Sequence, residues 1–177
     1  MSMNTKKKFW ILFSVGRDRP GIVDDISTVL HEGGGNIEDS RMAVLGGCFS
    51  VMTLFSCTPG QLESIRTGLE RLHDVGLQTS LHEARDPAAN AKQPGLPLRF
   101  EITAMDHPGI VRKVVHLLHS QGVNIESLDT QVSRAPLSGA PLFSLILEAT
   151  VPAEKPIAGV KEQLEALARD MNLDLVF

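Results

Sequence analysis

The sequence predicts an α+β protein made of two copies of one β-α-β-β-α-β module, and two observations predict it. Residues 16–40 recur as residues 104–128 with 11 identities in 25 positions and no gap. Each copy also alternates short apolar runs with apolar residues at helical spacing. The 177 residues suffice for two domains of this size. We therefore expect domains at 9–84 and 97–177, joined by a linker at 85–96.

In the first copy, the apolar run 9–15 predicts a buried strand. Pro20 is expected at the first position of the next helix, where no N–H is needed. Apolar residues at helical spacing continue this helix to Leu30, and the glycines at 33–35 end it. The remaining elements are strands at 37–45 and 48–57, turned at Gly46-Gly47, a helix at 62–72 and a strand at 77–81.

The second copy repeats this order of elements. Its strands are expected at 98–104, 124–133, 142–150 and 173–177, and its helices at 110–118 and 160–171. Six extra residues fall in 134–141, which is rich in Pro, Gly and Ser and therefore predicts a surface loop. A unit of this order folds as a ferredoxin-like sandwich, in which two helices cover one face of an antiparallel sheet.

Composition limits the classes of function. With 17 Lys and Arg against 21 Asp and Glu, the formal net charge is −4, so no basic surface for nucleic acid is expected. Two cysteines exclude a disulfide-rich scaffold. No apolar run approaches the roughly 18 residues of a membrane helix, and the N-terminus lacks the apolar core of a signal peptide. We expect a cytoplasmic protein without direct nucleic-acid or membrane contact.

One motif occupies the turn between the first strand and the first helix of each copy. Its residues are Asp18, Arg19, Pro20, Gly21 and Ile22, repeated as Asp106, His107, Pro108, Gly109 and Ile110. Free N–H groups and the helix dipole make such a turn suited to a carboxylate. The glycine lets a ligand or another backbone come close, and the aspartate either caps the helix or accepts a ligand ammonium. The alternative is an ordinary turn at a helix start.

A second motif starts the following strand, as Asn36-Ile37 and Asn124-Ile125. An asparagine amide offers donors and an acceptor, which suits the two charged ends of an amino acid. The same amide can equally satisfy the backbone of a loop. Both interpretations stay open.

No catalytic or metal-binding constellation is evident. Cys48 and Cys57 have no recurring histidine beside them, and we expect them to be buried strand cysteines. His116 and His119 lie three residues apart without a third ligand, so no metal site is expected. No cofactor is expected either.

The first helices of the two copies differ in charge. Asp24-Asp25 in the first copy corresponds to Arg112-Lys113 in the second. Either each pair lies on a solvated helix face, or the two helices face each other, within or between chains, with opposite charges adjacent.

The duplicated Asp-x-Pro-Gly-Ile-Val and Gly-x-Asn-Ile pattern resembles the ACT domain, a ferredoxin-like regulatory unit. The resemblance implies that modules pair side by side, join their sheets and bind an amino acid near the interface. The two motifs above would then form the binding site. It also implies kinship with tandem ACT regulators that lack a DNA-binding domain and act on an activator protein. The second copy departs from the pattern, because Ala104-Met105 replaces Gly16-Arg17.

We therefore expect a non-catalytic regulator that senses glycine or a similar amino acid, forms a homodimer and contacts an activator protein. One alternative is a small stand-alone enzyme of amino-acid or one-carbon metabolism, for which the two copies leave no catalytic domain. Another is an interaction module that binds no ligand.

Overall fold

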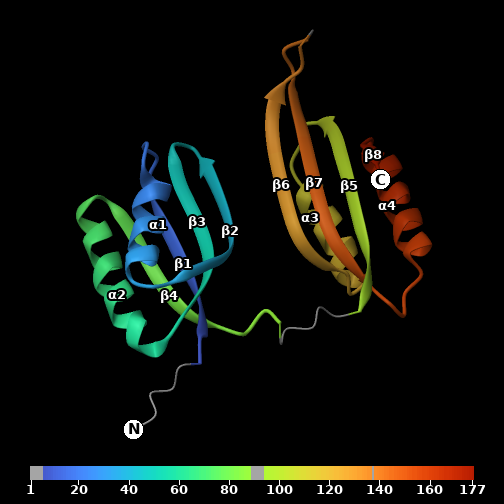
Figure 1. Ribbon diagram of the computed structural model, residues 1–177. Helices are drawn as coiled ribbons and strands as arrows, with labels where there is room; N and C mark the ends of the chain where they lie inside the picture. Colours follow the sequence, from blue (N-terminus) through green and yellow to red (C-terminus); the bar gives the residue numbers. More distant parts are fainter. Residues whose placement is uncertain (1–5, 89–93, 137) are drawn as a thin grey trace. The chain divides into compact units, whose positions relative to one another are not determined.

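The computed structural model describes residues 6–88, 94–136 and 138–177 (Figure 1). The chain divides into two compact units, Met1–Ala91 and Lys92–Phe177, called here the first and second modules. Part of the predicted linker, residues 89–93, lies outside the described residues, and its last two residues belong to a strand that starts at Gly95.

The first module has the predicted order of elements. They are β1 (Lys8–Arg17), α1 (Ile22–Glu32), β2 (Asn36–Leu45), β3 (Cys48–Cys57), α2 (Pro59–Asp74) and β4 (Leu77–Ala84). The strands form an antiparallel sheet in the order β2-β3-β1-β4. Gly46 and Gly47 turn the β2–β3 hairpin with φ values of 59° and 77°, as a tight hairpin turn requires.

The second module repeats this arrangement. Its elements are β5 (Gly95–Met105), α3 (Ile110–Ser120), β6 (Asn124–Arg134), β7 (Pro141–Pro152), α4 (Ile157–Met171) and β8 (Asp174–Val176). The antiparallel sheet has the order β6-β7-β5-β8. The six extra residues predicted from the repeat lie where β6 meets β7. The predicted α+β fold with two βαββαβ units is confirmed.

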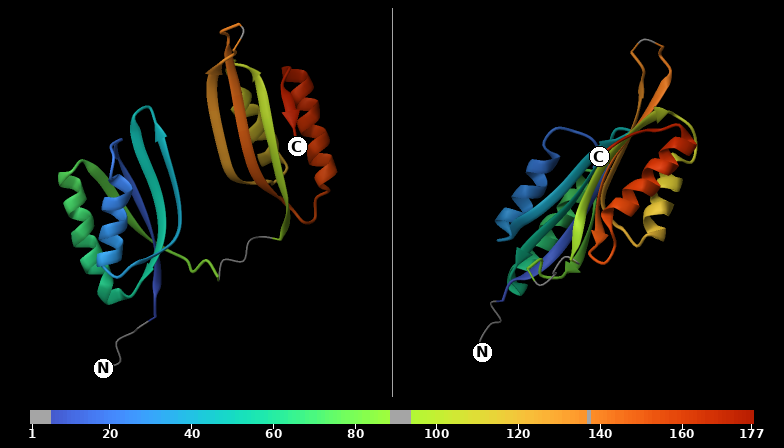
Figure 2. Two further views of the ribbon diagram at one scale, coloured as in Figure 1. Left: turned by 45° about the horizontal axis from the view of Figure 1, so that its top comes forward. Right: turned by 90° about the vertical axis from the view of Figure 1, so that its right-hand side faces the viewer.

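Each module places both helices on one face of its sheet, as the view along the sheets shows (Figure 2). The core lies between the helices and that face, because alternate strand residues such as Leu12 and Phe100 point toward the helices. The two cores are separate clusters: the first centres on Leu12, Phe55 and Ile65, and the second on Phe100 and Leu147. The opposite face of each sheet carries no helix.

Local chemistry explains where elements begin. The Thr58 backbone N–H donates to Gln61 Oε1 at 2.8 Å, which forms half of a capping box at the start of α2. Both edge strands β2 and β6 contain a bulge, where the register of the ladder shifts between Ile37 and Asp39 and between Ile125 and Ser127. Within the described ranges, no helix is long and apolar enough to cross a membrane.

Candidate ligand-binding site

The turn between β1 and α1 is fixed by backbone hydrogen bonds. The Asp18 N–H donates to the Gly47 carbonyl at 3.0 Å, which ties the turn to the β2–β3 hairpin. The Asp25 N–H donates to the Gly21 carbonyl at 2.9 Å and starts the helix. Pro20 was predicted at the first helical position, and this is wrong: α1 begins at Ile22 and Gly21 is its N-cap.

The β5–α3 turn has the same construction. The Asp106 N–H donates to the Pro141 carbonyl at 3.1 Å, and the Lys113 N–H donates to the Gly109 carbonyl at 3.0 Å. Both motifs end in a core isoleucine, since Ile22 and Ile110 are buried. The two turns are thus equivalent in structure as well as in sequence.

Backbone conformation accounts for the glycine of each motif. Gly21 has φ 88° and Gly109 has φ 98°, both in the left-handed region that side chains disfavour. A Cβ at Gly21 would meet only the Arg19 guanidinium, at 3.8 Å, and one at Gly109 would meet nothing within 4 Å. Glycine is therefore required by φ and not by close packing, and the space above both turns is open.

The aspartates of the motifs do not cap their helices. Neither α1 nor α3 has a side-chain hydrogen bond at its N-cap. Asp18 and Asp106 are exposed, and within the described parts of the chain neither carboxylate has a hydrogen-bond or ion-pair partner. Of the two roles considered for them, the capping role is not realised.

The second residue of the motif differs in its bonding between modules. Arg19 Nη2 donates to Asp25 Oδ2 at 2.6 Å, and Arg19 Nη1 donates to the Pro20 carbonyl at 3.2 Å. His107 Nδ1 lies 3.3 Å from the Pro108 carbonyl. These contacts hold the Arg19 guanidinium over the first turn of α1, where it forms an ion pair with Asp25.

Asn36 lies in a network on β2. Its Nδ2 donates to Glu38 Oε1 at 3.0 Å, and Ser56 Oγ donates to the same oxygen at 2.7 Å. These two hydrogen bonds lower the pKa of the Glu38 carboxyl, that from Ser56 most. The amide nitrogen of Asn36 therefore serves the strand, whereas the Ile37 side chain is 45% exposed.

In the second module, the Thr150 hydroxyl donates to the Glu126 carboxylate. Asn124 lies opposite Thr150 in the ladder, as Asn36 lies opposite Ser56. Asn124 is exposed and Ile125 is half-buried. The bulged glutamate and its hydroxyl partner are a shared feature of both modules that the sequence interpretation missed. The recurrence of Asn-Ile-Glu at both positions was the available signal.

The two predicted motifs lie at opposite ends of one helix. Asp18 precedes α1 and Asn36 follows it, and the 11 residues of α1 span roughly 16 Å. The same holds for Asp106 and Asn124 around α3. Within one module, a small amino acid cannot touch both motifs.

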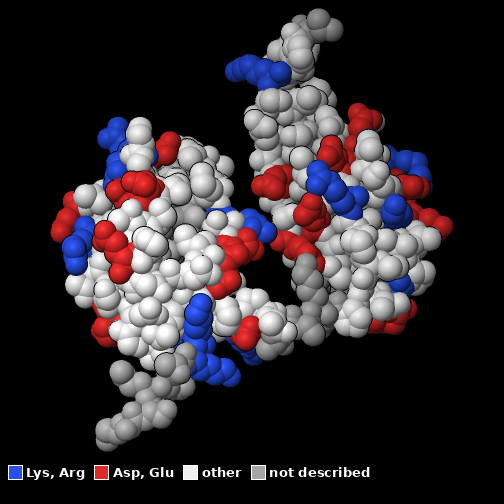
Figure 3. Space-filling model, in the orientation of Figure 1, with Lys and Arg blue, Asp and Glu red and all other residues white. Residues whose placement is uncertain are grey.

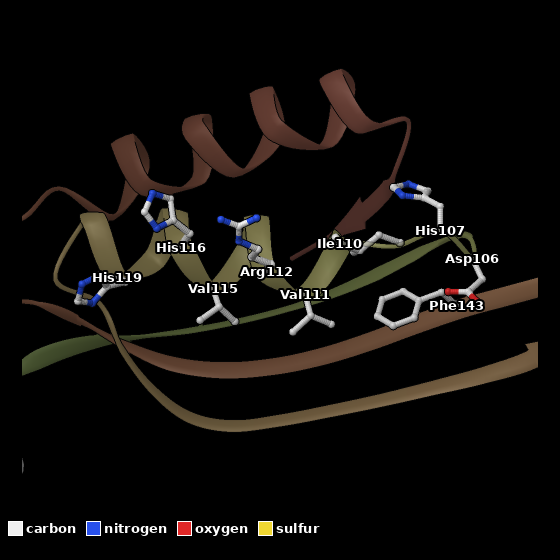
Figure 4. A pocket seen from close by; sticks show the side chains of 10 residues that line it. Asp106, His107, Ile110, Val111, Arg112, Val115, His116, His119 and Phe143 are labelled. Carbon is white, nitrogen blue, oxygen red and sulfur yellow. The ribbon is translucent and has the colours of Figure 1, made fainter.

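One hollow borders the turn motif of the second module, and another borders the Asn-Ile motif of the first. In the second module, a hollow of about 740 Å³ runs from Asp106 and His107 along α3 (Figure 4). Val111 and Val115 line its apolar side with Phe143 from β7, while Arg112 and His116 project from the same helix. In the first module, a hollow of about 490 Å³ lies at the other end of α1, beside His31, Asn36 and Ile37.

Comparison with known proteins identifies the module. A family model of the ACT domain matches residues 10–82, which include β1 to β4 almost entirely. The first module is thus similar to the ACT domain over nearly its whole length. The second module repeats its topology, its turn motif and its strand bulge.

Relatives match both modules together. The glycine cleavage system transcriptional repressor of Escherichia coli K12 is 25% identical over 170 residues, which cover 95% of this chain and 88% of the repressor. A solved structure of an unknown protein from Galdieria sulphuraria has a TM-score of 0.83 and 28% identity over 97% of both chains. A structure provisionally assigned as a glycine cleavage system transcriptional repressor has a TM-score of 0.69 and 22% identity, over 96% of this chain and 95% of that chain. This last likeness concerns the fold.

The remaining candidate residues are the cysteines and histidines. Among the described residues, no group of three or more His, Cys, Asp or Glu side chains is placed to hold a metal ion. Cys57 is buried, and burial raises the pKa of its thiol. Cys48 was also expected to be buried, and this is wrong: it is exposed, because it starts β3 directly after the hairpin turn.

Proposed function

We propose that this protein is a non-catalytic regulator that senses an amino acid, glycine or one of similar size, and controls transcription of the glycine cleavage system through contact with an activator protein. The ACT domain and the similarity to a repressor along nearly the whole chain support a regulatory role. They favour regulation over the alternative of a small enzyme. A regulator of transcription works in the cytoplasm of a bacterium, and we place the protein there.

One observation carries the ligand-sensing part of the proposal. At both strand-to-helix turns, an aspartate without a partner stands beside a glycine with open space above it. The carboxylate of Asp18 or Asp106 is suited to a ligand ammonium, and the first N–H groups of α1 or α3 are suited to a ligand carboxylate. Only a ligand that carries both charges close together, as an α-amino acid does, would use both partners.

The hollow beside the second turn is lined by one basic and one acidic side chain, together with three histidines. Arg112, His116 and His119 line the hollow along α3, together with His107 at its end, while Asp106 is the acidic residue there (Figure 4). The apolar side formed by Val111, Val115 and Phe143 limits how polar the ligand side chain can be. A small amino acid fits this combination.

Pairing of two copies would complete the site. β2 is an edge strand with an unpaired backbone edge, and exposed Met42 and Val44 lie along it. If β2 of one copy joined β2 of another in antiparallel fashion, the Asp18 turn of one would approach Asn36 of the other. This would unite motifs that α1 separates within a module, and it supports a homodimer.

Calorimetric titration tests ligand sensing directly. Glycine, serine and alanine are titrated into the wild type and into Asp18→Ala, Asp106→Ala and the double variant. We expect binding of a small amino acid that the double variant loses, since the carboxylates that accept the ammonium are gone. Asp170→Asn, at an exposed position of α4, is the control and retains binding. Absence of binding for every amino acid would favour the ligand-free interaction module instead.

A reporter strain tests the regulatory part. In Escherichia coli that lacks its own glycine cleavage repressor, a promoter fusion of the glycine cleavage genes is measured with and without this protein. We expect the protein to repress the promoter in minimal medium, and added glycine to relieve this repression. In the double variant Asp18→Ala, Asp106→Ala, glycine should no longer relieve it. Unchanged promoter activity would reject the assignment to this system while leaving amino-acid binding intact.

A further inference from the structure

The helix-free face of the first module is apolar at positions where the second module is charged. This face, called here the open face, consists of Phe9, Ile11, Phe13 and Val15 of β1 and Met52 and Leu54 of β3. Alternation along β1 sends Trp10 and Leu12 into the core and their neighbours to this face. Phe13 is 43% exposed and Met52 is 42% exposed.

The second module serves as an internal comparison. Ile11, Phe13 and Leu54 correspond to Arg99, Glu101 and Glu148 in the same strands and the same register. Arg99 Nη1 lies 2.7 Å from Glu148 Oε1, and Arg99 Nη2 lies 3.5 Å from Glu101 Oε1. Figure 3 views this face of the second module and shows positive and negative side chains interspersed over β5 and β7.

The fold therefore does not require apolar residues on this face. One copy of the module carries an ion-paired cluster there and keeps the same sheet. The other copy carries two phenylalanines, three aliphatic residues and a methionine there, in contiguous positions of β1 and β3. Contiguous apolar surface of this kind marks a contact with another molecule.

We propose that the open face of the first module packs against the same face of a second copy of this chain. Two like sheets with the same twist stack face to face about 10 Å apart, so a sheet face is complementary to itself. The whole sheet face, in which the open face occupies the two central strands, presents roughly 600 Å² over four strands. Two such faces bury about 1,200 Å², the lower bound of a standard interface.

The charges beside the open face also favour a second copy of this chain over a strongly charged partner. The positions on β2 that border Met52 and Leu54 are Arg41 and Asp39, and their side chains form an ion pair with each other at 2.5 Å. On β4, His82 stacks edge-on against Phe13, with ring centroids 5.6 Å apart. At these positions two identical faces meet without an unpaired charge from Arg41 or Asp39. The contact uses none of the β2 backbone edge, so it is separate from the edge pairing proposed above.

The decisive variant transfers the charges of the second module into the first. Ile11→Arg with Phe13→Glu reproduces Arg99 and Glu101 at the same positions of the same strand. Sedimentation and light scattering at about 100 µM, where a contact with micromolar Kd is nearly saturated, measure the molar mass. We expect the mass of the double variant to be half that of the wild type. Met52→Glu, on the neighbouring strand, gives the same result.

Val75→Glu is the matched control, because Val75 is 52% exposed but follows α2, away from the open face. Its mass stays that of the wild type. Trp10 fluorescence and circular dichroism establish that each variant is folded. A monomeric wild type at this concentration overturns the proposal, as does a wild-type oligomer whose mass the open-face variants leave unchanged. Neither result bears on amino-acid binding at the two turns, which the calorimetric titration tests separately.

Discussion

Ser56 Oγ donates a 2.7 Å hydrogen bond to Oε1 of Glu38, the residue that the β2 bulge leaves unpaired. Ser56 is buried, whereas Glu38 is exposed. The second module joins Thr150 to Glu126 in the same place. The bulge thus turns a glutamate toward a hydroxyl on the adjacent strand, and both copies retain this pair at the start of the edge strand.

The Glu38 pair predicts a pH-dependent contribution to stability. The folded pKa of Glu38 is lowered, so the contribution is present above the unfolded pKa of about 4.3 and is lost as the pH falls through the folded value. Ser56→Ala should lower the free energy of unfolding by about 1 kcal/mol at pH 7. The difference from the wild type should shrink as the pH falls toward about 3. Urea denaturation followed by Trp10 fluorescence measures both. A deficit independent of pH would show that the serine acts by packing alone.

The left-handed glycines predict a cost for any side chain. Gly21→Ala should destabilise the first module by about 1–2 kcal/mol, although the added Cβ meets no close neighbour. Gly60→Ala is the control, since Gly60 lies in the first turn of α2 with free space around it and no positive φ. It should be neutral or slightly stabilising. Equal effects of the two changes in urea denaturation would refute the role given to φ at Gly21.

The ion pair between Arg19 and Asp25 predicts a small, salt-sensitive effect. The two side chains are 36% and 37% exposed, so Asp25→Asn should cost less than about 1 kcal/mol at low salt. The loss should vanish in about 1 M NaCl, where the screening length is near 3 Å. Lys113 and His107 occupy the positions of Asp25 and Arg19 in the second module. Because His107 is not acidic and cannot form the equivalent ion pair with Lys113, Lys113→Asn should not be destabilising. Unfolding curves at both salt concentrations provide the comparison.

The separate cores predict that the modules unfold separately. Leu147→Ala empties a fully buried position of the second core and should cost about 2–5 kcal/mol there. The single tryptophan, Trp10, belongs to the first core, so its fluorescence midpoint should not move. Phe55→Ala should shift that midpoint instead. If each variant shifted the fluorescence midpoint and the circular dichroism midpoint together, the modules would not unfold independently.

Sequence interpretation predicted the fold because the repeat supplies two copies of most signals. The apolar stripe from Ile22 to Leu30 recurs from Ile110 to Leu118 and predicts a helix each time, whereas the Gly46-Gly47 turn predicts the hairpin of the first copy alone. The start of α1 was misplaced because Pro20 and Gly21 both suit a helix N-terminus, and only φ shows which one caps it. Cys48 was misjudged because alternation along β3 places it, with Ser50 and Met52, on the side of the strand that points away from the core.

The candidate site was harder to predict than the fold. The motifs at Asp18 and Asn36 were found, but their placement at opposite ends of α1 depends on helix length and strand direction together. The hydrogen bond between Glu38 and Ser56 joins residues 18 positions apart through a bulge. No local pattern marks such a bulge, because it arises from how two strands pair.

The hydrogen bonds from Asp18 to Gly47 and from Asp106 to Pro141 join each turn to the tip-side end of its own hairpin. Turn and hairpin are therefore coupled through the backbone, since displacing one without the other would break this hydrogen bond. The hairpin of the second module carries the extra segment at 134–141 beyond the bond. A longer piece of chain is thus linked to the turn of the second module than to the turn of the first.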